Sequence, residues 1–381
     1  MHRKNVEGKT MQDLSREKTF AELAIIGTKG CEGMLERISG YIGEWRKEEP
    51  YYIVEASFPR FGTGEAKGLI GDSVRGKDVF IVADCFNYGV EYKMFGRSVP
   101  MSPDDHYQDL KRVIQAISGK AARITVVMPM LYESRQHRRT ARESLDCAFM
   151  LQELVGMGVE NIMTFDAHDD RVRNAIPLNG FDNLMPTYQM IKKFIHTEED
   201  ISRDDIMIIS PDEGAITRGM YFATMLEVPL GMFYKRRDYR VVVDGRNPIV
   251  AHEYLGEDVK GKDVIVVDDI VSSGDSFLHI IDILKEKGAR RIFGFFTFGL
   301  FCNGLATFDT YYHNKLFDRV YATNSCYLTD ELKSRTWFKE VNVLKYIAYY
   351  IEAVNINKSV GKILDPTEKI HTLLETHSHK I

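Results

Sequence analysis

Two adjacent carboxylates, Asp268 and Asp269, directly follow an apolar run of the sequence. The four β-branched residues of that run, Val264–Val267, suit a central parallel strand that is covered on both faces. Because charges are costly to bury unpaired, we expect the strand to end at the two acids, at the carboxyl edge where open α/β sheets hold ligands. Carboxylate oxygens at that edge could accept hydrogen bonds from neighbouring hydroxyls of a sugar, or reach Mg²⁺.

The segment after the two acids is small and rich in hydroxyl groups. It consists of Ser272, Ser273, Gly274, Asp275 and Ser276. Its backbone N–H groups and hydroxyls can turn toward an anion, and a helix that we expect from about Phe277 to Lys287 adds the positive end of its dipole. A phosphate at this turn and a diol at the two acids describe a ribose 5-phosphate. The alternative is an ordinary strand-to-helix turn with capping serines and acids.

The composition predicts a globular protein, and the length allows two domains of ordinary size. The chain has 381 residues, 44% of them hydrophobic, which is enough for two ordinary cores. Its formal net charge of −5 gives no general attraction to nucleic acid or to anionic lipid. The sequence has no apolar run of membrane-spanning length, and Met1–Lys18 lacks the apolar core of a signal peptide. We therefore expect a cytoplasmic protein with no membrane or nucleic-acid partner.

The five cysteines are scattered and have no metal-binding or redox spacing, which favours buried free thiols. They are Cys31, Cys85, Cys147, Cys302 and Cys326.

Apolar strands alternate with helical patterns along the chain, which favours a parallel α/β architecture. Amphipathic patterns near 105–118 and 141–155 predict helices that cover the sheet of the first half. The expected strands are Asp78–Ala83, Ile124–Met128, Ile162–Phe165, Ile206–Ile209, Val264–Val267 and Ile292–Thr297.

A short internal repeat relates the two halves of the chain. Gly76–Asp84 resembles Gly261–Asp269, and Gly89 falls in register with Gly274. Two related domains are implied, although a Gly-Lys-Asp-Val entry to a buried strand is common enough to arise by coincidence. The first copy has Ala83 where the second has Asp268, so we expect only the second copy to keep the ribose-phosphate chemistry.

Four further motifs follow one another in an order and spacing typical of one enzyme family. They are a strand and proline followed by Arg135-Gln136, the strand end Asp166-Ala167-His168, the segment Ser210-Pro211-Asp212-Glu213-Gly214, and Tyr234-Lys235-Arg236-Arg237 before an irregular segment that reaches about Pro248. Together with the paired acids, they make the chain resemble the ribose-phosphate pyrophosphokinases, or phosphoribosyl pyrophosphate synthetases, from about Leu23 to Val354.

The resemblance implies the substrates ATP and ribose 5-phosphate and the cofactor Mg²⁺. It places ribose 5-phosphate on Asp268, Asp269 and the residues from Ser272 to Ser276. It places Lys235 and Arg237 on a flexible catalytic loop against the transferring β-phosphoryl group, where fixed positive charge would stabilise the transition state. A solvated charge run is the alternative for these two residues.

The resemblance also implies an ATP site and a metal site. The implied ATP-binding residues are Arg135, Gln136, Arg138, His168, Phe61 and Glu65. The implied Mg²⁺ ligands are His168 and Asp212. Planar guanidinium groups suit the polyphosphate, and Mg²⁺ needs few protein ligands when substrate oxygens complete its shell.

The segment from Phe61 to Glu65 matches a Phe-x-x-Gly-Glu pattern. In the family, the aromatic residue of this pattern holds adenine in the site of a neighbouring subunit. The resemblance therefore implies a homo-oligomer with a shared ATP site. Phe61 could equally be a core residue before a turn.

The implied fold has two phosphoribosyltransferase-like domains, each a mostly parallel sheet flanked by helices. From the resemblance and the repeat we expect an N-terminal extension at 1–20 and a C-terminal extension at 355–381. Between them we expect an ATP-side domain at 21–185 and a ribose-side domain at 186–354.

The chain departs from the family pattern at several positions. Asp275 brings an acid into the phosphate turn, His137 replaces an aspartate, and Thr63 replaces an acid in the adenine segment. Asp169 and Asp170 replace more neutral residues. These departures leave open a non-catalytic regulatory paralogue as an alternative. A phosphoribosyltransferase would explain the paired acids but not the first-domain motifs.

Overall fold

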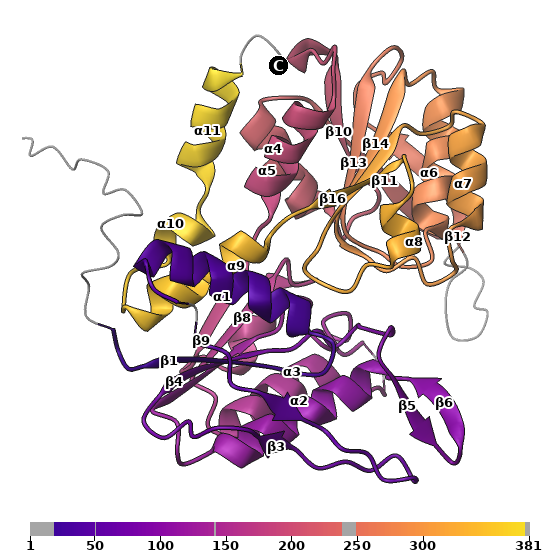
Figure 1. Ribbon diagram of the computed structural model, residues 1–381. Helices are drawn as coiled ribbons and strands as arrows, with labels where there is room; N and C mark the ends of the chain where they lie inside the picture. Colours follow the sequence, from indigo (N-terminus) through magenta and orange to yellow (C-terminus); the bar gives the residue numbers. More distant parts are fainter. Residues whose placement is uncertain (1–18, 50, 141, 238–248, 378–381) are drawn as a thin grey trace, which may run out of the picture. The chain divides into compact units, whose positions relative to one another are not determined.

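The computed structural model describes residues 19–49, 51–140, 142–237 and 249–377, with only the backbone described at 235–237 and 249–252. The chain forms two compact units (Figure 1). Unit 1 consists of Met1–Leu184 with Val343–Leu364, and unit 2 of Met185–Asn342 with Asp365–Ile381. Within the described ranges, no helix is long and apolar enough to cross a membrane.

Unit 1 is built on a parallel sheet of five strands in the order β1-β4-β7-β8-β9. Alternate residues of each strand point to opposite faces, and both faces are buried, which explains the continuous apolar runs in the sequence. The strands are β1 (Leu23–Gly27), β4 (Asp78–Val82), β7 (Arg123–Val127), β8 (Asn161–Phe165) and β9 (Gly180–Leu184).

Helices cover both faces of this sheet (Figure 1). Helices α2 (Pro103–Ile117) and α3 (Asp146–Gly156) form one core with the sheet, and α1 (Glu32–Arg46) and α9 (Leu344–Asn355) pack together on the other side. The predicted helix near 141–155 therefore begins later than expected. Smaller elements are the strand pairs β2 (Ala56–Ser57) with β3 (Leu69–Ile70) and β5 (Glu91–Met94) with β6 (Arg97–Pro100), and the short helix α10 (Gly361–Leu364).

Helix α9 belongs to unit 1, which corrects the domain boundaries expected from the sequence. Arg46 Nη2 donates hydrogen bonds to Glu352 Oε2 and Asn355 Oδ1, both at 2.7 Å. Asn355 Nδ2 in turn donates to Asp78 Oδ2 at 2.9 Å. A buried carboxylate such as Glu352 is stable only when it is paired, so this network holds α9 on unit 1. These contacts join residues about 300 positions apart, which no local pattern reveals.

Unit 2 is built on a sheet of seven strands in the order β12-β11-β10-β13-β14-β15-β16. All neighbouring pairs are parallel except β11 with β12. The strands are β10 (Ile206–Ser210), β11 (Leu230–Arg237), β12 (Ile249–Leu255), β13 (Asp263–Val271), β14 (Arg291–Gly299), β15 (Arg319–Thr323) and β16 (Phe338–Val341).

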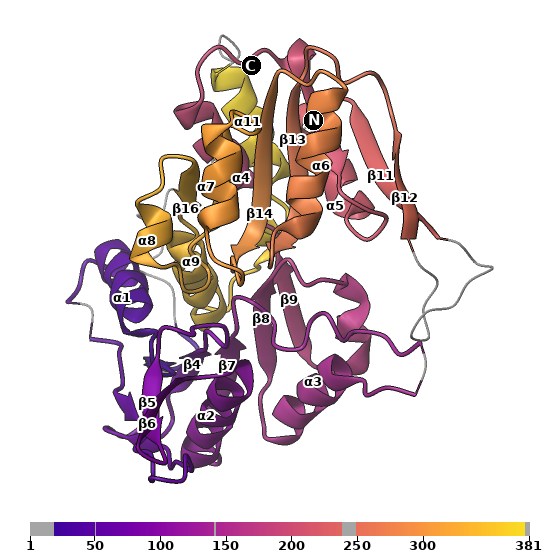
Figure 2. The same cartoon turned by 90° about the vertical axis from the view of Figure 1, so that its right-hand side faces the viewer.

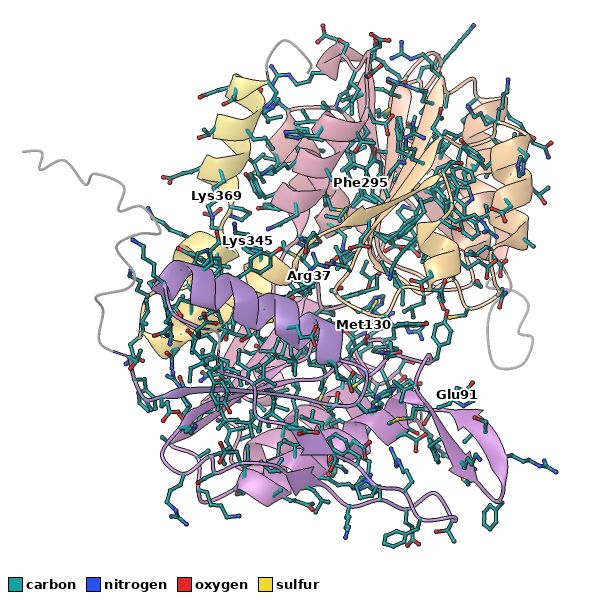
Figure 3. All side chains as sticks on the ribbon, in the orientation of Figure 1. Arg37, Glu91, Met130, Phe295, Lys345 and Lys369 are labelled. Atoms are coloured by element: carbon teal, nitrogen blue, oxygen red, sulfur yellow. The ribbon has the colours of Figure 1, made fainter. Side chains whose placement is uncertain are left out.

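Helices also cover both faces of the unit 2 sheet (Figure 2). One face carries α4 (Thr187–Thr197), α5 (Ile216–Leu226) and α11 (Thr367–Thr376), and the other carries α6 (Asp275–Glu286) and α7 (Ala306–His313), with the short helix α8 (Asp330–Lys333) beside β16. Phe295, which is labelled in Figure 3, belongs to the core under α4 and α5. Its ring meets those of Phe194, Phe222 and Tyr321.

The internal repeat is visible in the strand registers. Asp78 at the start of β4 pairs with Arg123 at the start of β7, and Asp263 at the start of β13 pairs with Arg291 at the start of β14. The preceding strand pairs β1 with β4 and β10 with β13 have the same register. The nine-residue match in the sequence therefore marks a repeat of neighbouring parallel strands in both units.

Candidate active site

Strand β13 carries both predicted acids but does not end at them. It continues to Val271, which pairs with Gly299 of β14, and Asp268 pairs with Phe296 within the same ladder. The prediction that the strand ends at the acids is therefore wrong. The physical reason is that β14 offers hydrogen-bonding partners along the whole of β13, while the acids find polar neighbours outside the ladder.

The polar neighbour of Asp268 is an arginine that the sequence did not single out. Arg218 of α5 places Nη1 at 3.6 Å from Asp268 Oδ1, and its side chain is only 9% exposed. Burial raises the pKa of Asp268 well above its usual value, the adjacent charges of Asp269 and Asp212 raise it further, and Arg218 opposes them. The acids therefore favour ligands that bring positive charge or donate hydrogen bonds.

The predicted phosphate turn lies at the head of α6. Ser272 and Ser273 are half-buried, whereas Asp275 and Ser276 are exposed. Gly274 is buried with φ +90°, and a Cβ at this position would overlap the ring of Phe308. Because a side chain is excluded on both grounds, glycine is required. Helix α6 begins at Asp275, two residues earlier than expected, so its first turn lies directly beside this turn. The Asp275 N–H donates to Ser273 Oγ at 3.4 Å, which shows that the first N–H groups of the helix face the serine hydroxyls.

An exposed thiol borders the same turn. Cys302 Sγ lies 3.5 Å from Ser272 Oγ, and the Cys302 backbone N–H donates to Ser272 O at 2.8 Å. The other four cysteines are buried and free. The expectation of buried thiols is therefore wrong for Cys302, because the loop after β14 runs along the surface here.

Asp212, one predicted metal ligand, lies in the loop between β10 and α5. Its Oδ1 accepts hydrogen bonds from the backbone N–H groups of Gly214 at 2.9 Å and Ala215 at 3.3 Å, in the loop that leads into α5. Its charge also acts on Asp268. The structure therefore brings Asp212 and the paired acids together within unit 2.

The predicted nucleotide motifs lie in unit 1, in the loops after β7 and β8. The loop after β7 begins near Met130, which is labelled in Figure 3. Arg135 and Arg138 are exposed there, and Gln136 Nε2 donates to Ser144 O at 2.9 Å and Arg138 O at 3.4 Å. The Gln136 amide thus closes its own loop, which leaves the two arginines as the outward-facing donors.

His168 connects the loop after β8 to the loop after β7. Its backbone N–H donates to Ser134 Oγ at 2.9 Å, and the centroid of its ring lies 5.3 Å from that of His137. The Arg-Gln motif and the Asp-x-His motif, 30 residues apart in the sequence, are therefore neighbours at the carboxyl edge of the sheet. His168 and Asp212 belong to different units.

Two of the departures from the family pattern contact each other. His137 Nε2 lies 3.5 Å from Asp169 Oδ2. Hydrogen bonds from Arg171 lower the pKa of Asp169 to about 2, so this carboxylate is charged at neutral pH. Burial and the nearby His168 lower the pKa of His137. Relative to the family pattern, the loop after β7 thus has an additional histidine, and the loop after β8 has an additional acid that contacts it.

The predicted adenine segment is a tight turn that presents an aromatic side chain. Phe61 N donates to Glu65 O at 2.7 Å, and Gly64 N donates back to Phe61 O at 2.9 Å. The Phe61 side chain is 56% exposed, so it is not a core residue. The turn is held by Arg60, whose Nη2 donates to the buried Asp109 Oδ2 at 2.7 Å. Phe61 is therefore a fixed, outward-facing aromatic group.

The predicted catalytic residues Lys235 and Arg237 lie on strand β11 rather than on a loop. Their side chains are outside the described part of the structure, as are residues 238–248. Their backbone pairs with β12, which places Lys235 opposite His252 and Arg237 opposite Ile249. The residues that the resemblance places on a flexible loop, Tyr234 to Arg237, therefore belong to a strand.

No group of three or more His, Cys, Asp or Glu side chains is arranged to hold a metal ion among the residues that the structure describes. An ion bound mainly through substrate phosphate oxygens needs fewer protein ligands than that. Asp212, one of the two predicted ligands, has the carboxylate oxygens that Mg²⁺ prefers, so its chemistry fits this ion.

The fold and the site define a class of α/β protein with two related units, each built on a mostly parallel sheet, one of which carries paired acids near the end of a central strand and a glycine turn after it. Three family models match successive parts of the chain, the second and third of which overlap. They describe the N-terminal domain of ribose phosphate pyrophosphokinase (residues 23–158), the phosphoribosyl transferase domain (182–298) and the phosphoribosyl synthetase-associated domain (244–364). The chain belongs to the ribose-phosphate pyrophosphokinase family.

Individual relatives agree with this assignment. The chain is 26% identical over 315 residues to the ribose-phosphate pyrophosphokinase of Vibrio parahaemolyticus, covering 82% of this chain and 91% of the relative. It is 27% identical over 326 residues to that of Haemophilus ducreyi, covering 84% and 94%. The crystal structure of phosphoribosylpyrophosphate synthetase from Mycobacterium smegmatis has a TM-score of 0.71 at 20% identity, covering 88% of this chain and 99% of that one. The predicted fold class and family are confirmed.

Proposed function

We propose that the chain transfers the pyrophosphoryl group of ATP to the C1 hydroxyl of ribose 5-phosphate, which yields phosphoribosyl pyrophosphate and AMP. The observation that carries this proposal is the end of β13, where Asp268 and Asp269 meet a glycine turn at the head of α6. The family membership of nearly the whole chain favours this enzyme over a regulatory paralogue or a phosphoribosyltransferase.

Ribose 5-phosphate fits the end of β13 by its two kinds of polar group. Its phosphate would accept hydrogen bonds from the N–H groups and hydroxyls of Ser272–Ser276, strengthened by the dipole of α6. Its ring hydroxyls would donate to Asp268 and Asp269. Asp275 is exposed in the first turn of α6, where an acid is favoured by the helix dipole.

ATP would bind to unit 1. Arg135 and Arg138 are exposed and can pair with phosphate oxygens. His168 would contribute one Mg²⁺ ligand and Asp212 another, with Gln136 holding the arginine loop in shape. When bound, Mg²⁺ would neutralise the charge of the polyphosphate and align it.

The reaction itself would proceed by direct displacement. The C1 oxygen of ribose 5-phosphate forms a bond to the β-phosphorus, and the bond from the β-phosphorus to the oxygen that bridges it to the α-phosphorus breaks, so that AMP leaves. The C1 hydroxyl proton passes to solvent, because a loose phosphoryl transition state needs no strong base. Lys235 and Arg237 would supply positive charge to the transferring group. No protein nucleophile is required.

Phe61 and Glu65 would serve the ATP site of a neighbouring subunit, which requires a homo-oligomer. The fixed, exposed ring of Phe61 supports this proposal, because an aromatic face can stack on adenine. We also propose a cytoplasmic location, supported by five free cysteines, as expected in a reducing compartment.

The experiment that tests the proposal is the formation of AMP and phosphoribosyl pyrophosphate from ATP, Mg²⁺ and ribose 5-phosphate. We expect equal amounts of both products from the native protein. Lys235→Ala should lower the rate on the order of 10²-fold or more, because it removes transition-state charge. Lys333→Ala, which changes a partly exposed lysine of α8 that pairs with Asp330, should stay within about twofold. A folded native protein that binds ATP but forms neither product would contradict the proposal.

A further inference from the structure

The buried guanidinium of Arg218 is the feature of unit 2 that no sequence motif explained. It lies on the first turn of α5, with its side chain 9% exposed and its Nη1 at 3.6 Å from Asp268 Oδ1. Burying an arginine is costly unless its charge is used. The position therefore calls for a role that an apolar side chain would not fill.

The need for a cation at this position follows from the acids around it. Asp268 and Asp269 are adjacent in β13, the Asp269 side chain is buried, and Asp212 acts on Asp268 from the neighbouring loop. Without a nearby cation, three carboxylates would repel one another and would also repel the phosphate of an incoming sugar phosphate. Arg218 supplies this positive charge next to the Asp268 carboxylate.

The backbone that carries Arg218 is held closely against the sheet. The next residue, Gly219, packs so near to β10 and β11 that a Cβ there would lie 3.1 Å from Leu230 Cδ1 and 3.5 Å from Ser210 Cβ. The preceding loop is fixed by the Asp212 carboxylate, which accepts hydrogen bonds from the N–H groups of Gly214 and Ala215. Arg218 therefore projects from a rigid base, as a residue that orients another side chain must.

We propose that Arg218 is a positioning residue of the ribose 5-phosphate site, whose guanidinium holds the Asp268 carboxylate in the orientation that receives the hydroxyls of the sugar. This inference rests on the sugar site described under the proposed function. Arg218 acts through Asp268 and takes no part in bond making. A guanidinium keeps its positive charge even when it is buried, whereas a buried lysine ammonium readily loses its own.

The test compares full-length variants in steady-state kinetics, with each substrate varied while the other is saturating. Arg218→Met keeps the apolar stem and removes the charge. We expect it to raise the KM for ribose 5-phosphate at least tenfold and to leave the KM for ATP within about twofold. Arg218→Lys should fall between native and Met. The matched control is Arg203→Met, which breaks the ion pair between Arg203, just before β10, and Glu227, just after the last residue of α5, and should change neither KM.

A double mutant separates positioning from general packing. If Arg218 acts through Asp268, Arg218→Met combined with Asp268→Asn should raise the KM for ribose 5-phosphate little beyond Asp268→Asn alone. Independent, additive effects would overturn the proposal. So would a folded Arg218→Met protein in which both KM values are unchanged or rise equally. If Arg218→Met does not fold, Arg218→Lys decides by the same criteria.

Calorimetric titration of ribose 5-phosphate into the same proteins keeps this inference distinct from the proposed reaction. A native protein that binds ribose 5-phosphate but forms no AMP would contradict the reaction, while the dissociation constants of the variants would still test the positioning role. A dissociation constant for Arg218→Met equal to the native value would overturn that role even if the native enzyme turns over normally.

Discussion

Strands β4 of unit 1 and β13 of unit 2 begin alike and end differently. At the start, Asp78 and Asp263 are both fully buried, and each follows a glycine with positive φ by two residues, Gly76 and Gly261. Arg123 binds Asp78 through two nitrogens, at 2.8 and 2.6 Å. Arg290 binds Asp263 in the same forked manner, at 2.8 Å for both contacts, and Arg291 adds a further bond.

The end of β4 is occupied by the protein's own side chains. Asn87 Nδ2 donates to Gly30 O at 3.2 Å, its Oδ1 accepts from Gly89 N at 3.1 Å, and its backbone oxygen bonds to His106 Nε2 at 2.9 Å. Asp84 Oδ1 accepts from Phe86 N at 3.0 Å. The polar groups of this loop are therefore used within the loop and its surroundings, which leaves little for an anion.

The helix that follows β4 also differs from its counterpart in unit 2. The β5–β6 hairpin separates β4 from α2, and α2 carries its own capping box of Ser102 and Asp105. By contrast, α6 starts directly after Gly274 without a side-chain cap. The comparison teaches that the start of the strand preserves the fold in both units, while ligand binding depends on polar groups left available at its end.

The largest expected effect is at the end of β13. Asp268→Asn with Asp269→Asn should lower the rate of phosphoribosyl pyrophosphate formation on the order of 10³-fold, because each lost charge-assisted hydrogen bond costs about 1.5–3 kcal/mol. Asp84→Asn, at the position equivalent to Asp269, should stay within about threefold. The measurement is kcat/KM with ribose 5-phosphate varied. Equal losses in both variants would break the comparison.

A second difference concerns the two glycines that the repeat aligns. Gly274→Ala should lower the free energy of unfolding by about 2 kcal/mol or more, because it places a side chain at φ +90° and against Phe308. It should also raise the KM for ribose 5-phosphate. Gly89→Ala, at an exposed position, should cost less than about 0.5 kcal/mol. Urea unfolding and steady-state kinetics measure both, and an innocuous Gly274→Ala would contradict the glycine requirement.

The smallest expected effect concerns the start of β13, where the acid serves stability. Burial raises the pKa of Asp263, but the hydrogen bonds and charges of Arg290 and Arg291 outweigh it and leave the pKa below its usual value. Asp263 therefore stabilises the protein at pH values above about 3.9, which is the pKa of its carboxyl group in the unfolded chain. This stabilisation is lost as the pH falls through the lower pKa that the same group has in the folded protein.

Asp263→Asn should accordingly lower the free energy of unfolding at pH 7 by about 2 kcal/mol. The loss is smaller than for a fully buried ion pair, because the partly exposed Arg290 can be solvated by water when its partner is removed. The substitution should also flatten the dependence of stability on pH below about 4, the range in which the native carboxylate takes up its proton. The KM for ribose 5-phosphate should stay near the native value. Denaturant unfolding at several pH values checks this, and an unchanged pH dependence would refute it.

The sequence predicted the central strands well because they are continuous apolar runs, as Val264–Val267 illustrates. Strands without such runs, such as β9 (Gly180–Leu184), gave no signal; its Asp182 accepts a hydrogen bond from Tyr350 of the distant helix α9. The placement of α9 itself depends on Arg46 and Glu352, which no local pattern connects.

The candidate site shows the same limit. The acids and the glycine turn were predictable because they are consecutive in the sequence. Arg218 was not, because it reaches Asp268 from a helix that begins more than 50 residues earlier. The strand was expected to stop at the acids because that partner was unknown.

The measurement that tests the central claim most directly is a calorimetric titration of ribose 5-phosphate, in the presence of Mg²⁺ and an ATP analogue with a methylene group between its α- and β-phosphates. We predict one site per chain in the native protein, the same site in Asp84→Asn, and no binding in the protein that carries both Asp268→Asn and Asp269→Asn. Native affinity in that double variant, or loss of binding in Asp84→Asn, would show that the sugar phosphate does not bind at the end of β13.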